Sequence, residues 1–141
     1  MTAPTRSRPQ PWTPLVIGTV LLAQGLTFAF FAVLHAGIPL LGIDQPAIVP
    51  AAIPESLCAL ATLGAGMIVM TRRGWAPSAA IGGQALAVAG VLAGIASQIG
   101  DPNATELNVI YLRIMLAVLL AGIAVVLVPA VRRALTPVHA R

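Results

Sequence analysis

The sequence has little charge, few aromatic residues and a single cysteine. Only 9% of its 141 residues are charged and 58% are hydrophobic, whereas roughly a quarter of the residues in a soluble domain are charged. Because so few charged side chains cannot cover a globule in water, the composition excludes a soluble domain. The lone Cys58 excludes an intrachain disulfide and a metal site built from several cysteines.

Lysine is absent, and all eight basic residues are arginines. Their excess over the four acidic residues gives a formal net charge of +4, a balance that also occurs in nucleic-acid-binding proteins. The arginines lie in short groups between apolar runs rather than along one exposed face, so nucleic acid is not an expected partner. We expect the lipid bilayer to be the main surroundings of the chain.

Four apolar runs are long enough to cross a bilayer as helices, which takes about 20 residues. They predict a single all-α transmembrane domain over residues 1–141, an integral membrane four-helix bundle. Residues that commonly cap helices precede the first and fourth runs. Thr13 can cap the first helix, with Pro14 in its first turn, and Asn103 can cap the fourth, with Glu106 three residues later. The predicted spans are 15–34, 51–70, 77–96 and 109–128, with short polar tails at 1–12 and 132–141.

The positions of the arginines predict the orientation of these spans. Arginines flank one side of the membrane, whereas the opposite side holds the acidic residues Asp44, Asp101 and Glu106. Because flanking arginines favour the cytoplasmic side, we expect both termini in the cytoplasm of a cell (inner or plasma) membrane, one short cytoplasmic turn and two outer loops. Trp12 and Trp75, beside the same ends, suit an interfacial position. The flanking arginines are Arg6, Arg8, Arg72, Arg73, Arg132, Arg133 and Arg141.

The third span carries a stripe of small residues at helical spacing. Membrane helices associate through small residues that let their backbones approach closely, so this face is expected to meet a neighbouring helix. We favour packing inside the bundle over a seam between two copies of the chain, because each helix first needs an internal neighbour. The predicted packing residues are Gly83, Ala87, Gly90 and Gly94, continued by Ser97.

Two ionisable residues lie inside the predicted spans, Glu55 in the second and Arg113 in the fourth. Each begins a stripe of small residues, which predicts that both face the bundle interior. Counted from the cytoplasmic ends, both lie about 6 Å inside the outer hydrocarbon boundary. Because charged residues in a membrane usually pair or face water, we predict an ion pair between them. The stripes are Glu55, Ala59, Thr62 and Gly66, and Arg113, Ala117, Ala121 and Ala124.

Other polar residues are expected to join this pair beneath the outer loop that connects the first two spans. His35 and Gln24 share a face of the first span, while Asn108 and Tyr111 begin the fourth. Three interpretations of the pair stay open: a structural clamp, a site for a ligand, proton or ion, and separate snorkelling of the two side chains to the interface. For His35 and Gln24 we favour structural polar contacts over ligand or proton-relay roles.

No motif of an enzyme or cofactor site is found in the sequence. It contains no phosphate-binding glycine loop, no His-Glu-x-x-His, no Cys-x-x-Cys and no Gly-x-Ser-x-Gly. We therefore expect no catalytic residue, no metal and no cofactor. Haem held by two histidines is disfavoured, because the second histidine, His139, lies in the cytoplasmic tail.

The expected function is that of a non-enzymatic membrane protein, either an accessory subunit or a binder of a small or lipid-like ligand. The alternative is a small transporter or channel in which Glu55 exchanges protons or a cation. Beside the bilayer, the partners left open are another membrane protein and a second copy of the chain.

Two local patterns resemble the uncharacterised small four-helix integral membrane proteins of high-GC bacteria. One is the glutamate-containing start of the second span, residues 53–58 (IPESLC), and the other is the Asn-x-x-Tyr-x-Arg start of the fourth, residues 108–113. The resemblance implies the fold over most of the membrane region and no particular activity. Small multidrug transporters resemble the chain only in having four short helices, since their essential carboxylate lies in the first span, where this chain has Gln24.

Overall fold

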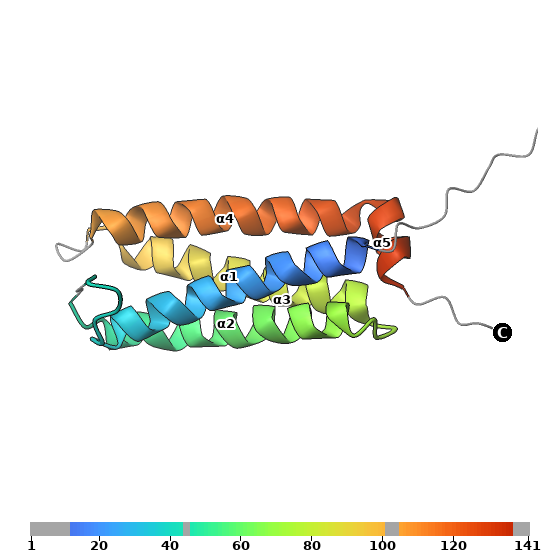
Figure 1. Cartoon of the computed structure of the whole chain (residues 1–141). Coiled ribbons are helices and arrows are strands. Elements are labelled where there is room, and N and C mark those ends of the chain that lie inside the picture. The colour runs from blue at the N-terminus through green and yellow to red at the C-terminus, as the bar shows by residue number, and fades with distance from the viewer. Residues whose placement is uncertain (1–11, 44–45, 101–104, 137–141) are drawn as a thin grey trace, which may run out of the picture.

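The structure is a computed structural model that describes residues 12–43, 46–100 and 105–136. The described residues form five helices and no strand. Four long helices lie side by side, each running opposite to the one before it, and a short fifth helix lies across one end (Figure 1). The helices are α1 Thr13–His35, α2 Val49–Met70, α3 Ala76–Ser97, α4 Glu106–Leu127 and α5 Pro129–Leu135.

The four long helices are each 22 or 23 residues long and apolar enough to cross a membrane. At 1.5 Å per residue, 22 residues extend about 33 Å, which matches a hydrocarbon core about 30 Å thick. The prediction of an all-helical chain with four long apolar helices is confirmed, and this architecture fits a small multi-pass membrane protein.

Proline and threonine begin these helices, although not always at the predicted residue. α1, α2, α3 and α5 have a proline in their first turn. Thr13 does not cap α1 but is its first residue. The cap of α4 is Thr105, whose Oγ1 accepts a hydrogen bond from the Asn108 N–H over 3.3 Å. The predicted cap Asn103 lies outside the described residues, as do Arg6, Arg8, Asp44, Asp101, His139 and Arg141.

Glycines bring the backbones of α1 and α2 together. A Cβ atom at Gly66 would lie 3.1 Å from the carbonyl oxygen of Gly18, and one at Gly25 would lie 2.9 Å from the backbone nitrogen of Leu63. Larger residues at these positions would push the helices apart, so the small residues permit the most extensive helix contact in the bundle.

The small stripe of α3 lies against helices of the same chain. A Cβ atom at Gly83 would lie 2.9 Å from the carbonyl oxygen of Ala61 in α2, and one at Gly90 would overlap Sγ of Cys58. Gly94 faces Leu112 of α4. The stripe thus packs inside the bundle between α2 and α4, with Ala87 buried and Ser97 exposed at its end.

In α4 the packing face differs from the predicted one. The small residues after Arg113 are exposed, and so is Arg113 itself. Large side chains three and four residues apart fill the core instead. The exposed stripe is Arg113, Ala117, Ala121 and Ala124, and the buried face is Asn108, Tyr111, Leu112, Met115, Leu119 and Val126.

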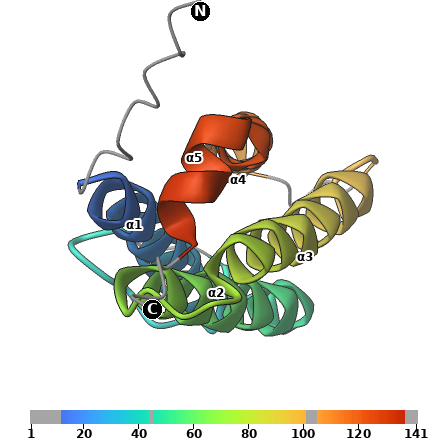
Figure 2. The ribbon, with the colours of Figure 1, turned by 90° about the vertical axis from the view of Figure 1, so that its right-hand side faces the viewer.

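The two ends of the bundle differ in charge. The beginnings of α1 and α3 and the ends of α2 and α4 meet at one end, which α5 crosses and which we call the arginine end (Figures 1 and 2). The turn between α2 and α3 and the helix α5 supply its arginines, and two exposed tryptophans flank it. These residues are Arg72, Arg73, Arg132 and Arg133, with Trp12 and Trp75. The opposite end holds His35 and Glu106.

Candidate functional site

Two ionisable side chains from neighbouring helices meet inside the bundle, toward the end opposite the arginines. Nδ1 of His35 lies 2.7 Å from Oε2 of Glu55, within hydrogen-bond distance, and with Glu55 as a carboxylate the ring N–H is the donor. The His35 side chain is fully buried, and the Glu55 side chain is 9% exposed. Because a charged group inside a membrane needs a partner or water, the pair explains how α2 accommodates a carboxylate. We call these two residues the His–Glu pair.

The end of α1 fixes the position of His35. Gly37 has a φ of +82°, and the N–H of Ile38 donates to the carbonyl oxygen of Val33 over 3.2 Å. These features are those of a Schellman motif, which ends a helix at a glycine. The carbonyl oxygen of His35 then accepts a hydrogen bond from the Ile48 N–H over 2.8 Å. Since α2 begins at the next residue, this bond ties the end of α1 to the start of α2.

Aromatic rings bring α4 to the same place. Tyr111 stacks on Phe31 of α1 with ring centroids 3.6 Å apart and an interplanar angle of 7°, and it meets Phe28 edge-on at 6.3 Å. The Phe31 ring also lies 6.2 Å from the His35 ring. Tyr111 is near enough to Glu55 for the two groups to interact electrostatically. The site is therefore built from α1, α2 and α4.

Three polar atoms at this end of the bundle are buried without a hydrogen-bond partner in the described part of the chain. They are Nε2 of His35, the hydroxyl of Tyr111 and Oδ1 of Asn108. Tyr111 is 5% exposed and Asn108 6%. Each such atom costs about 1 to 3 kcal/mol, and most buried polar groups in proteins are paired. His35 and Tyr111, together with Asn108 one turn before Tyr111 on α4, therefore have unused hydrogen-bonding capacity.

The unpaired atoms differ in whether they donate or accept hydrogen bonds. A neutral imidazole that donates from Nδ1 has an acceptor at Nε2, and an amide oxygen accepts only. The tyrosine hydroxyl can donate or accept. Together with the carboxylate of Glu55, the site offers mainly hydrogen-bond acceptors. It is thus suited to a group that carries N–H or O–H donors.

The predicted ion pair between Glu55 and Arg113 is wrong. Glu55 is bonded to His35, whereas Arg113 lies on the exposed side of α4, where the described residues give it no ion pair with Glu55. The physical reason is the rotation of α4, which turns Tyr111 and Leu112 inward. Arg113 lies about 10 Å from the start of α4 at 1.5 Å per residue, a position that suits snorkelling of its long side chain to the interface.

Gln24 and Gln84 are buried away from the His–Glu pair. Gln24 is 11 residues from His35, about 17 Å along α1, and both of its amide atoms lack a partner among the described residues. Gln84 lies against Gly122 of α4, yet its Nε2 donates to the carbonyl oxygen of Ala80 in its own helix over 3.3 Å. The structure therefore does not bring Gln24 into the outer polar cluster.

Cys58 has a packing role. Its Sγ lies against Gly90 and 4.0 Å from the carbonyl oxygen of Ala87. No group of three or more His, Cys, Asp and Glu residues that could hold a metal ion occurs among the described residues.

Comparisons with models of protein families, with curated proteins and with solved structures found no match for this chain.

Proposed function

We propose that this chain is a non-enzymatic membrane protein that binds the polar group of a small or lipid-like ligand at the His–Glu pair. The observation that carries the proposal is a buried, hydrogen-bonded His–Glu pair at the same end of the bundle as three buried, unpaired polar atoms from α1 and α4. Because the site is rich in acceptors, the ligand carries a primary ammonium or hydroxyl group. With the arginine end in the cytoplasm, as arginine placement favours, the site lies toward the outer leaflet of a cell membrane.

The packing of the helices supports access to this site from the side. α1 packs closely on α2, α2 on α3 and α3 on α4, whereas few close backbone contacts join α1 to α4. Phe28, Phe31 and Tyr111 bridge these two helices through their rings. A ligand group that enters between α1 and α4 therefore has to move these aromatic side chains, but it does not have to separate two closely packed helices.

The proposal is tested by thermal unfolding of the full chain in detergent. Phosphatidylethanolamine carries an ammonium group with N–H donors, whereas phosphatidylcholine with the same acyl chains carries none. We expect phosphatidylethanolamine to raise the Tm more than phosphatidylcholine does. Glu55→Gln removes this difference, and Arg113→Gln, at the same level of the bundle but exposed, retains it.

Two further measurements keep this test decisive. Asn108→Leu removes one unpaired acceptor without touching the His–Glu pair, so it reports on the site if Glu55→Gln does not fold. Free ethanolamine, added in place of the lipid, tests a small soluble ligand. Equal Tm shifts from both lipids, together with no shift from ethanolamine, would refute the proposed donor-bearing ligand.

A second candidate, a proton- or cation-coupled transporter that uses Glu55, has one observation in its favour, the short contact between two titratable groups. The arginine end is less suited to conduction. Buried apolar side chains from all five helices gather there, including Leu135 of α5. A pH-sensitive dye in proteoliposomes tests this candidate, and a flux abolished by Glu55→Gln would favour it over ligand binding.

A further inference from the structure

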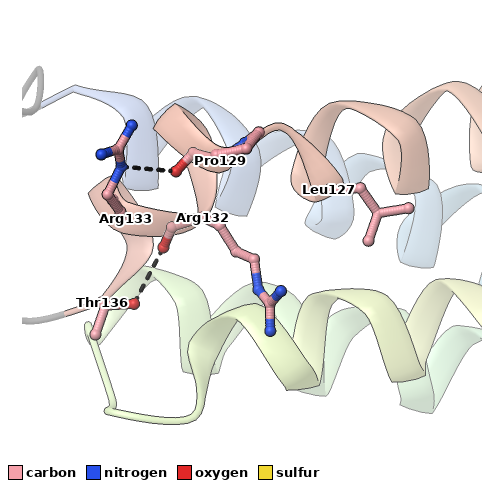
Figure 3. Close-up of a pocket in the computed structure, with 5 residues that line it drawn as sticks. All are labelled: Leu127, Pro129, Arg132, Arg133 and Thr136. Atoms are coloured by element: carbon pink, nitrogen blue, oxygen red, sulfur yellow. Dashed lines mark hydrogen bonds between the residues drawn. The ribbon is translucent and has the colours of Figure 1, made fainter.

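A second polar site lies at the arginine end, where α4 passes into α5. The chain ends α4 at Leu127 and restarts at Pro129 in a different direction, which leaves a hollow of about 410 Å³ beside the bend (Figure 3). The hollow is open, since all five residues that line it are exposed. Its lining consists of Leu127, Pro129, Arg132, Arg133 and Thr136.

The lining divides by chemistry. Leu127 and Pro129 supply an apolar wall at the end of a helix long enough to span the membrane. Arg132 and Arg133 leave α5 in different directions and place cationic groups at the hollow (Figure 3). Arg133 uses its Nε to donate to the carbonyl oxygen of Pro129 over 3.1 Å, which orients the side chain. Its two terminal amino groups stay available for an anion.

The other arginine is also available. The guanidinium of Arg132 makes no hydrogen bond with the described residues, and no described carboxylate lines the hollow. The hydroxyl of Thr136 donates to the carbonyl oxygen of Arg132 over 3.1 Å, so its oxygen can still accept. Two arginines that have no anionic partner among the described residues, beside an apolar wall, match a molecule with an anionic head and an apolar body.

We propose that this hollow binds the headgroup phosphate of an anionic phospholipid from the leaflet at the arginine end. Both arginines line the hollow, and the planar fork of a guanidinium group is suited to contact phosphate oxygens. Leu127 and Pro129 contact the glycerol and the first carbons of the acyl chains. Basic pockets beside membrane helices are known to recognise anionic headgroups. The site is independent of the His–Glu pair, which lies toward the other end.

The test measures phospholipid binding to the full chain in detergent by native mass spectrometry. Phosphatidylglycerol is titrated against phosphatidylcholine with the same acyl chains. One arginine near an anionic surface raises the affinity about fivefold. Removing both, by Arg132→Gln with Arg133→Gln, is therefore expected to weaken phosphatidylglycerol binding on the order of 25-fold. The control, Arg72→Gln with Arg73→Gln, removes the same charge from the same end outside the hollow and changes the affinity by less than about twofold.

A second variant keeps the charges. Leu127→Trp fills the apolar side of the hollow and is expected to weaken phosphatidylglycerol binding while both arginines remain, so it reports on the site if the arginine variant does not fold. Equal losses from the two arginine pairs would show a diffuse electrostatic attraction and overturn the proposal. So would equal affinity for the two lipids, or displacement of phosphatidylglycerol by an excess of inorganic phosphate, which would indicate a site for a free anion.

Discussion

The energetic coupling between His35 and Glu55 is the sharpest prediction of the structure. The two side chains meet over 2.7 Å in a nearly dry position. Removing one partner of a buried pair leaves the other uncompensated and costs about 3 to 5 kcal/mol. We therefore expect His35→Leu and Glu55→Leu each to lower the free energy of unfolding by about 3 kcal/mol.

The double variant separates the pair from its members. Replacing both partners leaves no uncompensated polar group in the core. The double variant His35→Leu with Glu55→Leu is therefore expected to lower the free energy of unfolding by less than the sum of the two single changes. The difference, which is the coupling energy, is about 2 kcal/mol for a hydrogen bond to a charged group. Hydrogen bonds between membrane helices are often weaker, about 0.6 kcal/mol on average. A coupling above about 1 kcal/mol thus distinguishes this buried pair from an ordinary interhelical contact.

The assay is reversible unfolding in mixed micelles of mild detergent and dodecyl sulfate. Arg113→Leu is the matched control, because Arg113 is exposed on α4, and its effect is expected to stay within about 0.5 kcal/mol. The same cycle run with Glu55 and Arg113 is expected to show no coupling. Additive effects for His35 and Glu55, or a substantial coupling between Glu55 and Arg113, would refute the assignment of the pair.

Two further predictions concern packing and orientation. Gly90→Ala places a methyl group against Sγ of Cys58 and is expected to destabilise the fold by about 1 to 3 kcal/mol in the same unfolding assay. Adding Cys58→Ala to Gly90→Ala restores stability. The control Gly82→Ala, whose added Cβ meets nothing within 4 Å, is neutral or stabilising. A loss of stability in Gly90→Ala that depends on protein concentration and persists in the double variant would instead place the small stripe of α3 between two copies of the chain. Orientation is tested with single cysteines in a Cys58→Ala background and a membrane-impermeant maleimide. Gly74→Cys is expected to react only after the membrane is opened. Leu41→Cys is expected to react already in intact cells. Reaction of both cysteines in intact cells, or the reverse pattern, would contradict cytoplasmic termini.

The four long helices could be predicted because span length and apolarity are local properties of the sequence. The partner of Glu55 could not be predicted in the same way. Depth and helical face put Glu55 and Arg113 at one level, but they do not say which helices touch or how each is rotated. Direct succession along the chain is the signal that favours α1 as the neighbour of α2, and with it His35.

The small residues of α4 show a second limit. Small side chains mark an interface only where two backbones come close, as at Gly18 and Gly66. α4 contacts α1 through the rings of Tyr111 and Phe31, and there volume rather than smallness defines the buried side. A stripe of alanines therefore does not identify the packing face without knowledge of the helix separation.

The tie between α1 and α2 has a consequence for the biogenesis of the protein. Chains emerge from the ribosome with the N-terminal part first, so α1 and α2 are available before α3 and α4. This first hairpin already contains the glycine contacts and both members of the His–Glu pair. The partner of this carboxylate, which is costly to leave alone in lipid, is thus available before the later helices are made.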